Sequence, residues 1–120
     1  MWEVEFADEF DAEFDGLDPD IQDELLAQLS VLRQFGPQAR RPRVDTLNGS
    51  SHANMKELRF SAGGGEWRVA FAFDPHRKAI VLVAGDKSGQ GSEARFYRAL
   101  VKKADARFKA HLNRLTAKRR

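Results

Sequence analysis

The sequence predicts an α+β fold in which a helical hairpin precedes a group of β-strands and a long helix follows them. Residues 66–73 alternate between large apolar and small or charged side chains, with the period of two of a strand that has one buried face and one open face. Apolar side chains recur every three or four residues in 19–35 and again in 92–118, as in amphipathic helices. Segments rich in glycine and proline separate these blocks.

Length and composition indicate a small soluble protein. The 120 residues are expected to form one domain, 1–120, with a frayed tail at 118–120. No apolar run reaches the roughly 18 residues of a membrane-spanning helix, and the N-terminus lacks the layout of a secretory signal. We therefore expect a cytoplasmic protein without membrane contact. The absence of cysteine excludes disulfides, thiolate nucleophiles and cysteine-type zinc sites.

The net charge of +2 conceals a strong asymmetry along the chain. Residues 1–38 contain 11 acidic side chains and a single basic one, whereas residues 39–120 contain 19 basic and 7 acidic side chains. The acidic part should repel nucleic acid and the basic part attract it, so binding to nucleic acid would be oriented. Two merely solvated faces would give the same charge counts.

The N-terminal part predicts a strand followed by two helices. Apolar and acidic residues alternate in 2–6, as in a short strand, and phenylalanines four residues apart in 6–17 mark a short amphipathic helix. A second helix is predicted at 19–35, where Asp18 stands at the N-cap with a proline after it. Gly36 and the next proline end that helix. The two helices should form a hairpin.

The middle of the chain predicts a long loop and then three strands. Residues 38–54 are polar, and long loops of this kind are more often functional than idle. The strands are expected at 55–60, 66–73 and 79–86, and the last holds a continuous apolar run typical of a strand covered on both faces. Three arginines of the loop could contact a phosphate backbone or simply face the solvent: Arg40, Arg41 and Arg43.

The C-terminal part predicts a long helix from Ser92 to about Lys118. Its apolar stripe faces the sheet, and Tyr97 lies on that stripe, while Arg95, Arg98 and Lys102 lie on or near the opposite side. All nine phenylalanines of the chain are expected in the core rather than on a base-stacking surface.

Most familiar catalytic constellations are missing from the sequence. The three histidines are scattered without the spacing of metal ligands, so no metal is expected. The glycines at 89–91 lack the context of a phosphate-binding loop, and no cofactor motif is present. What remains is a set of lysine, arginine and tyrosine side chains on or beside the strands.

Such a set can cut RNA without a metal, because RNA supplies its own nucleophile, the 2′-hydroxyl. The protein has to orient that hydroxyl, stabilise the negative charge that develops on the phosphate, and manage two protons. Arginine suits the second task, and lysine or tyrosine near other cations can act as acid or base. On this reasoning the set is as consistent with binding nucleic acid as with cleaving it.

Several short segments, in their order and spacing, resemble the phage-derived Gp49-like/HigB toxins of the RelE/ParE superfamily, which belong to type II toxin–antitoxin systems. The resemblance spans nearly the whole chain, from Trp2 to Leu112. The segments that carry it are Asp45-Thr-Leu47, Asn54–Arg59, Phe71–Pro75, Ala79-Ile80, Gly85–Gly89, Ala104-Asp105 and His111-Leu112.

The resemblance implies a small antiparallel sheet of about four strands, with the N-terminal helical hairpin packed on it and a C-terminal helix. It also implies a ribosome-dependent mRNA endonuclease that gives a 2′,3′-cyclic phosphate and blocks translation. The implied partners are mRNA on the ribosome and a cognate helix-turn-helix antitoxin. The family's catalytic positions fall on Arg68, Lys87 and Tyr97, and its basic positions on the preceding strand fall on Lys56 and Arg59.

Strand geometry separates two of these candidates. Lys56 and Arg59 are an odd number of residues apart, so a regular strand sends them to opposite faces. Arg59 shares its face with Glu57, which could serve as a base, and we favour Arg59 as the companion of Arg68. Tyr97 could be catalytic or purely structural, because it lies on the apolar side of its helix.

Two other functions fit the same sequence. A ParE-like toxin of the same fold would inhibit DNA gyrase by binding it, with no acid or base required. A basic nucleic-acid-binding domain without catalysis would show affinity that falls steeply with salt. The basic residues are spread over several strands instead of one exposed helix, which argues against this last possibility.

Overall fold

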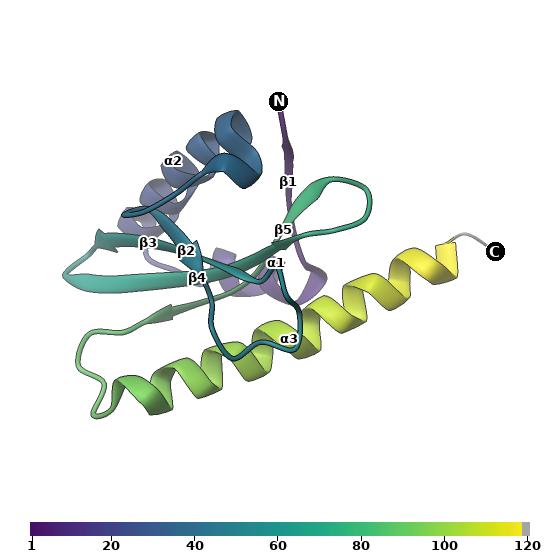
Figure 1. The fold of residues 1–120 in the computed structure, drawn as a ribbon. Helices are drawn as coiled ribbons and strands as arrows, with labels where there is room; N and C mark the ends of the chain where they lie inside the picture. Colours follow the sequence, from purple (N-terminus) through teal and green to yellow (C-terminus); the bar gives the residue numbers. More distant parts are fainter. Residues whose placement is uncertain (119–120) are drawn as a thin grey trace.

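A five-stranded sheet with helices on both faces forms the centre of the computed structural model, which describes residues 1–118 (Figure 1). Of the predicted frayed tail, residues 119–120 lie outside the described residues, and Lys118 ends the last helix. The elements are β1 (Glu3–Phe6), α1 (Asp8–Asp15), α2 (Pro19–Phe35), a 3-10 turn η1 (Gly36–Gln38), β2 (Val44–Thr46), β3 (Lys56–Ala62), β4 (Gly65–Phe73), β5 (Lys78–Asp86) and α3 (Glu93–Lys118).

The strand order confirms the predicted α+β fold and adds one strand to it. The sheet runs β1-β5-β4-β3-β2, with antiparallel pairing throughout except that β1 lies parallel to β5. There are five strands instead of about four, because Val44–Thr46 forms an edge strand inside the segment expected to be a loop. Three residues are too few to show a period of two, so the sequence carried no signal for this strand.

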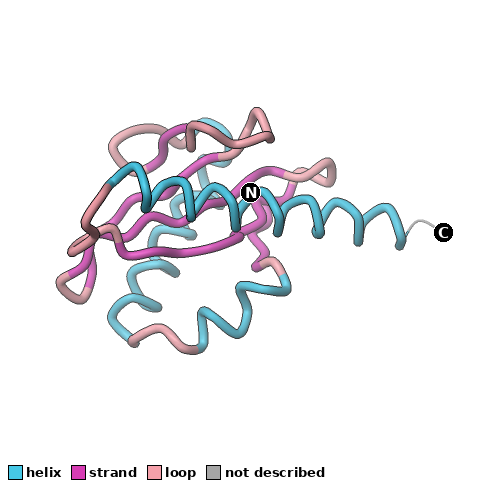
Figure 2. Tube along the Cα trace, turned by 90° about the horizontal axis from the view of Figure 1, so that it is seen from below, coloured by secondary structure: helices cyan, strands magenta, loops and turns pink. Residues whose placement is uncertain are grey.

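Two apolar layers sandwich the sheet, one under the α1–α2 hairpin and one under α3 (Figures 1 and 2). Val69 and Phe71 of β4 face the hairpin, whereas Ala70 and Ala72 face α3. The expectation that this strand has one open face was therefore wrong over its inner half. The alternating residues there are small because α3 packs closely against them.

The strand β5 is covered on both sides, as its continuous apolar run predicted. Ala70 pairs with Val83 but the next residue of β4 pairs with Val81, which leaves Leu82 as an extra residue in β5. Through this β-bulge both Leu82 and Val83 join the layer under α3. The bulge thus adds apolar area where the last helix docks.

The end of α2 contains both a required glycine and an unexpected exposed ring. Gly36 has a positive φ of 54°, and a Cβ there would lie 2.3 Å from the Trp2 indole nitrogen, so only glycine fits.

Phe35, just before Gly36, is 49% exposed. The prediction that all nine phenylalanines lie in the core is wrong for Phe35, because this last residue of α2 lines a surface pocket together with residues of the segment 38–43.

Neighbouring leucines of α2 provide a test of the packing. Leu25 is completely buried and Leu26 is 46% exposed. Leu25→Ala should lower the free energy of unfolding by about 2–5 kcal/mol through the cavity it leaves. Leu26→Ala should change it by less than about 0.5 kcal/mol. Urea unfolding followed by circular dichroism measures both, and equal effects would contradict this packing.

Candidate functional site

Four of the predicted site residues meet where β3, β4 and the first turns of α3 come together. In the strand pairing Arg59 lies directly opposite Arg68, and Glu57 lies opposite Ala70. All of these side chains are on the face that α3 covers, and Tyr97 reaches them from the helix. We call Glu57, Arg59, Arg68 and Tyr97 the polar cluster.

A chain of hydrogen bonds joins the polar cluster. Arg68 Nε donates to the Tyr97 hydroxyl over 3.2 Å, and that hydroxyl donates to Glu57 Oε1 over 3.1 Å. Arg59 Nε donates to the same Oε1 over 2.6 Å, while Arg68 Nε lies 3.9 Å from it. Among residues 1–118, both hydrogen bonds to the Glu57 carboxylate are accepted by its Oε1 atom, and its Oε2 atom accepts no hydrogen bond.

The polar cluster is buried at its centre and open at its rim. The Glu57 side chain is only 3% exposed and that of Arg68 12%, whereas Arg59 is 36% exposed. The hydrogen bond to Glu57 raises the pKa of Arg59 above its ordinary value. Two guanidinium groups against one carboxylate leave an excess positive charge, which suits a phosphodiester.

Asp45 of the edge strand β2 extends this network outward. Its carboxylate lies 3.4 Å from Arg59 Nη2 and 2.8 Å from Arg41 Nη2. The hydrogen bond from Arg41, with one from the Thr46 amide, lowers the pKa of Asp45. Asp45 was missed as a site residue, because its role depends on β2, which the sequence did not reveal.

Two candidate lysines are not part of the polar cluster. Lys56 pairs with Phe71, whose side chain faces the α1–α2 hairpin, so Lys56 lies on the opposite face of the sheet. Lys87 donates to Glu93 over 3.0 Å. Among the described residues no hydrogen bond or ion pair links Lys87 with the polar cluster.

The six residues predicted to contact RNA or the ribosome are all exposed and form two groups. Arg40, Arg41 and Arg43 lie beside the edge strand, and the backbone oxygen of Arg43 accepts a hydrogen bond from the Arg59 amide over 2.8 Å. The second group lies on the first three turns of α3: Arg95, Arg98 and Lys102.

Asp105 of α3 ties the loop before β3 to the helix. Its carboxylate accepts hydrogen bonds from the Ser50 hydroxyl and from both the amide and the hydroxyl of Ser51. His52 in the same loop packs edge-to-face on Phe108. The hydrogen bonds of Asp105 and the packing of His52 together hold the loop that leads into β3, the strand that carries Glu57 and Arg59.

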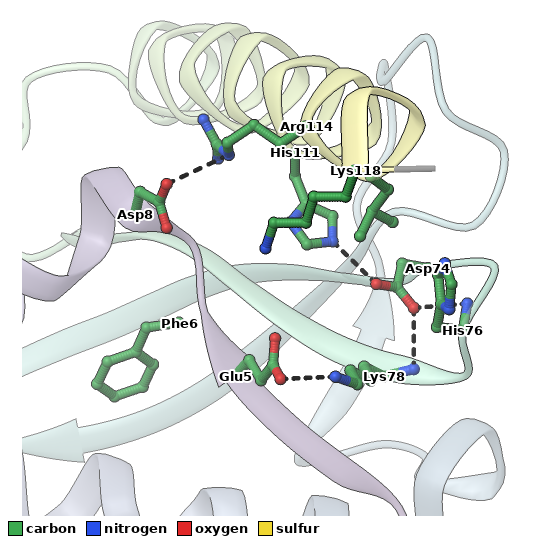
Figure 3. Close-up of a pocket in the computed structure, with 10 residues that line it drawn as sticks. Glu5, Phe6, Asp8, Asp74, His76, Lys78, His111, Arg114 and Lys118 are labelled. Carbon is green, nitrogen blue, oxygen red and sulfur yellow. Dashed lines mark hydrogen bonds and ion pairs between the residues drawn. The ribbon is translucent and has the colours of Figure 1, made fainter. Parts of the chain in front are cut away.

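A pocket of about 410 Å³ lies at the other end of α3, away from the polar cluster (Figure 3). The buried Asp74 carboxylate accepts the Lys78 amide over 3.1 Å and lies 2.9 Å from His111 Nε2. Arg114 pairs with Asp8 over 3.3 Å, and the Lys78 amine with Glu5 over 2.8 Å. These contacts join α3 to α1, β1 and the β4–β5 turn around the pocket, which Lys118 also lines.

Residues 1–118 contain neither a cluster of metal ligands nor a membrane-spanning helix. No group of three or more histidine or acidic side chains is placed to hold a metal ion. None of the helices is long and apolar enough to cross a membrane.

The Asp105 contact should make stability depend on pH. Burial raises the pKa of Asp105, but hydrogen bonds from Ser50 and Ser51 outweigh it and lower the pKa below its ordinary 3.8. The contact therefore stabilises the fold above about pH 4 and is lost as the pH falls through the lowered pKa. Asp105→Asn should lower the free energy of unfolding at pH 7 and have little effect at pH 2. Urea titrations at both pH values test this, and an equal loss at each would contradict it.

Comparison with known proteins identifies the family of the chain. The family described as phage derived protein Gp49-like matches residues 12–109. The toxin HigB2 of Mycobacterium tuberculosis is 46% identical over 98 residues, which are 81% of this chain and 48% of that protein. The toxin HigB3 of the same organism is 43% identical over 76 residues, 63% of this chain and 65% of that protein. The chain thus spans about half to two thirds of these relatives.

A solved structure shows the same fold at low sequence identity. A double arginine mutant of the Escherichia coli toxin RelE, in the free state, superposes with a TM-score of 0.57 at 14% identity, covering 85% of this chain and 95% of that one. This likeness concerns the fold alone. The family match over residues 12–109 confirms the resemblance seen in the sequence, and the chain belongs to the Gp49-like family, with HigB toxins among its relatives and a RelE-like fold.

Proposed function

We propose that this protein is the toxin of a type II toxin–antitoxin system and acts as a ribosome-dependent mRNA endonuclease. Its relatives are described as HigB toxins, which supports the toxin role. The observation that carries the nuclease role is the polar cluster, in which a carboxylate, a phenol and two guanidinium groups lie in direct contact. These are the groups needed to move two protons and stabilise a phosphorane-like charge.

In the proposed reaction the 2′-oxygen of RNA attacks the adjacent phosphorus while its proton passes to Glu57 Oε2. The bond from phosphorus to the 5′-oxygen breaks, and that oxygen takes the proton of Tyr97. The products are a 2′,3′-cyclic phosphate and a 5′-hydroxyl. The hydrogen bond of 3.1 Å between Tyr97 and Glu57 then offers a path by which the proton returns to the tyrosine.

The arginines have separate parts in this scheme. Arg68 contacts the Tyr97 oxygen and would stabilise the phenolate left after proton transfer, together with the phosphate. Arg59 is the more exposed arginine of the polar cluster, and its side chain would lie between the solvent and the Glu57 carboxylate. A phosphate of the RNA that accepts a hydrogen bond from Arg59 in place of Glu57 would draw this side chain away from Glu57. The 2′-hydroxyl could then reach the Glu57 carboxylate.

The proposed partners are RNA and an antitoxin. The exposed arginines beside β2, together with Arg95, Arg98 and Lys102 in the first turns of α3, would contact mRNA and ribosomal RNA. Lys56 and Lys87 would contribute to binding without entering the reaction. A cognate helix-turn-helix antitoxin would neutralise the protein. Such an antitoxin encoded beside this gene would support the toxin role independently of any enzyme assay.

Substitutions in the polar cluster test the reaction. Glu57→Gln, Tyr97→Phe and Arg68→Ala should each slow message cleavage by about 100-fold or more, because each removes a proton carrier or a charge that stabilises the transition state. Lys56→Ala and Lys87→Ala should cost less than about tenfold, since their charges lie outside the polar cluster. The assay is translation of a defined mRNA with and without ribosomes, with cleavage mapped at the 3′ ends.

Lys109→Ala, an exposed residue of α3, is the matched control and should cleave as the unmodified protein does. If the unmodified protein leaves the message intact with and without ribosomes, and Arg68→Ala does not relieve growth inhibition, the proposal is wrong. Growth arrest with DNA damage signalling and intact mRNA would instead support the gyrase inhibitor. Binding that falls with salt and yields no product would support the non-catalytic domain.

A further inference from the structure

A groove at the edge of the sheet combines an exposed aromatic ring with arginines. It has a volume of about 370 Å³, within the range of ligand sites. Its floor is apolar and includes Val31 and the half-exposed Phe35, both at the end of α2. Its wall is the segment 38–43, which carries Arg40, Arg41 and Arg43. We call this the Phe35 groove.

The charged residues that line the Phe35 groove are all arginines, so its charge is positive. From residue 25 to residue 44 the chain has four arginines and no acidic residue, although the rest of its N-terminal part is strongly acidic. A partner that fills the groove must therefore be anionic and must also present an apolar or flat group to Phe35.

Two ion pairs that share Asp45 link the Phe35 groove to the polar cluster. Arg41 lines the groove and pairs with Asp45 over 2.8 Å, and the same Asp45 oxygen lies 3.4 Å from Arg59 Nη2. Arg59 in turn donates to Glu57. A strand of RNA whose scissile phosphate lies at Arg59 would therefore reach the groove by passing over the edge strand β2.

We propose that the Phe35 groove binds a single-stranded RNA segment next to the cleavage position, with a base stacked on Phe35 and phosphates on Arg40 and Arg43. This rests on the proposed nuclease function. RNA supplies both chemistries that the groove requires, and stacking on an aromatic ring tolerates any base. The groove thus adds affinity without selecting a sequence, and Phe35 acts in binding and not in the reaction.

The test measures binding by the intact chain at low salt. The probe is a fluorescein-labelled 2′-O-methyl oligouridylate of about ten nucleotides, which lacks the nucleophile and cannot be cut, and binding is followed by fluorescence anisotropy. Phe35→Ala should weaken binding about tenfold, Phe35→Leu about as much, and Phe35→Trp should preserve it, because stacking requires a ring. Leu26→Ala, at the other exposed large apolar residue of α2, is the matched control and should bind normally.

The arginines are tested by the salt dependence of the affinity. Arg40→Ala with Arg43→Ala should reduce the slope of log affinity against log salt by about 0.7 for each lost phosphate contact. Lys109→Ala with Lys118→Ala removes the same charge outside the groove and should leave the slope unchanged. Arg41 is left intact because it also pairs with Asp45. Circular dichroism of each variant confirms that it is folded.

Three outcomes overturn the Phe35 groove as an RNA site. The first is that the unmodified protein does not bind the probe. The second is that all Phe35 variants bind the probe equally well. The third is that Phe35→Leu binds the probe fully and an acidic apolar peptide displaces the probe, which would indicate a peptide site. If the Phe35 variants bind normally while Arg68→Ala abolishes message cleavage, the groove proposal fails and the proposed function stands. If the Phe35 variants bind weakly but the unmodified protein cuts no message, the groove proposal stands and the proposed function fails.

Discussion

The carboxylate of Glu57 connects three elements of the fold at one buried point. A charge that is 3% exposed is unfavourable unless it is paired, and here Arg59 and Tyr97 bond to it while Arg68 bonds to that tyrosine. Removing one partner of a buried pair commonly costs about 3–5 kcal/mol. The contacts of the proposed reaction centre therefore also help to hold β3, β4 and α3 together, in addition to the strand pairing and the apolar layer under α3.

Acidic residues of the N-terminal part of the chain also form ion pairs with basic residues of the C-terminal part. Arg107 of α3 forms a bidentate pair with Glu13 of α1, and its hydrogen bonds lower the pKa of that carboxyl. About two turns further on, Arg114 pairs with Asp8 and Glu9. Acidic residues of α1 thus pair with Arg107 and Arg114 of α3, whereas the arginines at the start of this helix and beside β2 remain exposed. The acidic part of the chain therefore helps to hold α3 in place and leaves the cations near the polar cluster exposed to solvent.

What the sequence predicted correctly depended on local pattern. The period of two in 66–73 and the odd spacing that separates Lys56 from Arg59 are properties of a strand alone, and they located the strand and the face that carries Arg59. What it missed depended on distant contacts. Val44–Thr46 becomes a strand only because β3 pairs with it, and Asp105 acts through serines more than 50 residues away. Phe35 has the same side chain as the core phenylalanines, and only the point where α2 ends exposes it.

The order of elements along the chain has a consequence for synthesis. Every strand precedes α3, so the sheet and its N-terminal hairpin leave the ribosome first, and domains begin to fold during synthesis. Until the helix follows, Glu57 lacks Tyr97, and the apolar layer formed by Ile80, Leu82 and their neighbours is uncovered. The polar cluster is complete only once α3, which follows every strand in the described residues, has been made and has docked on the sheet. A nascent chain that ends before Tyr97 therefore lacks the complete polar cluster.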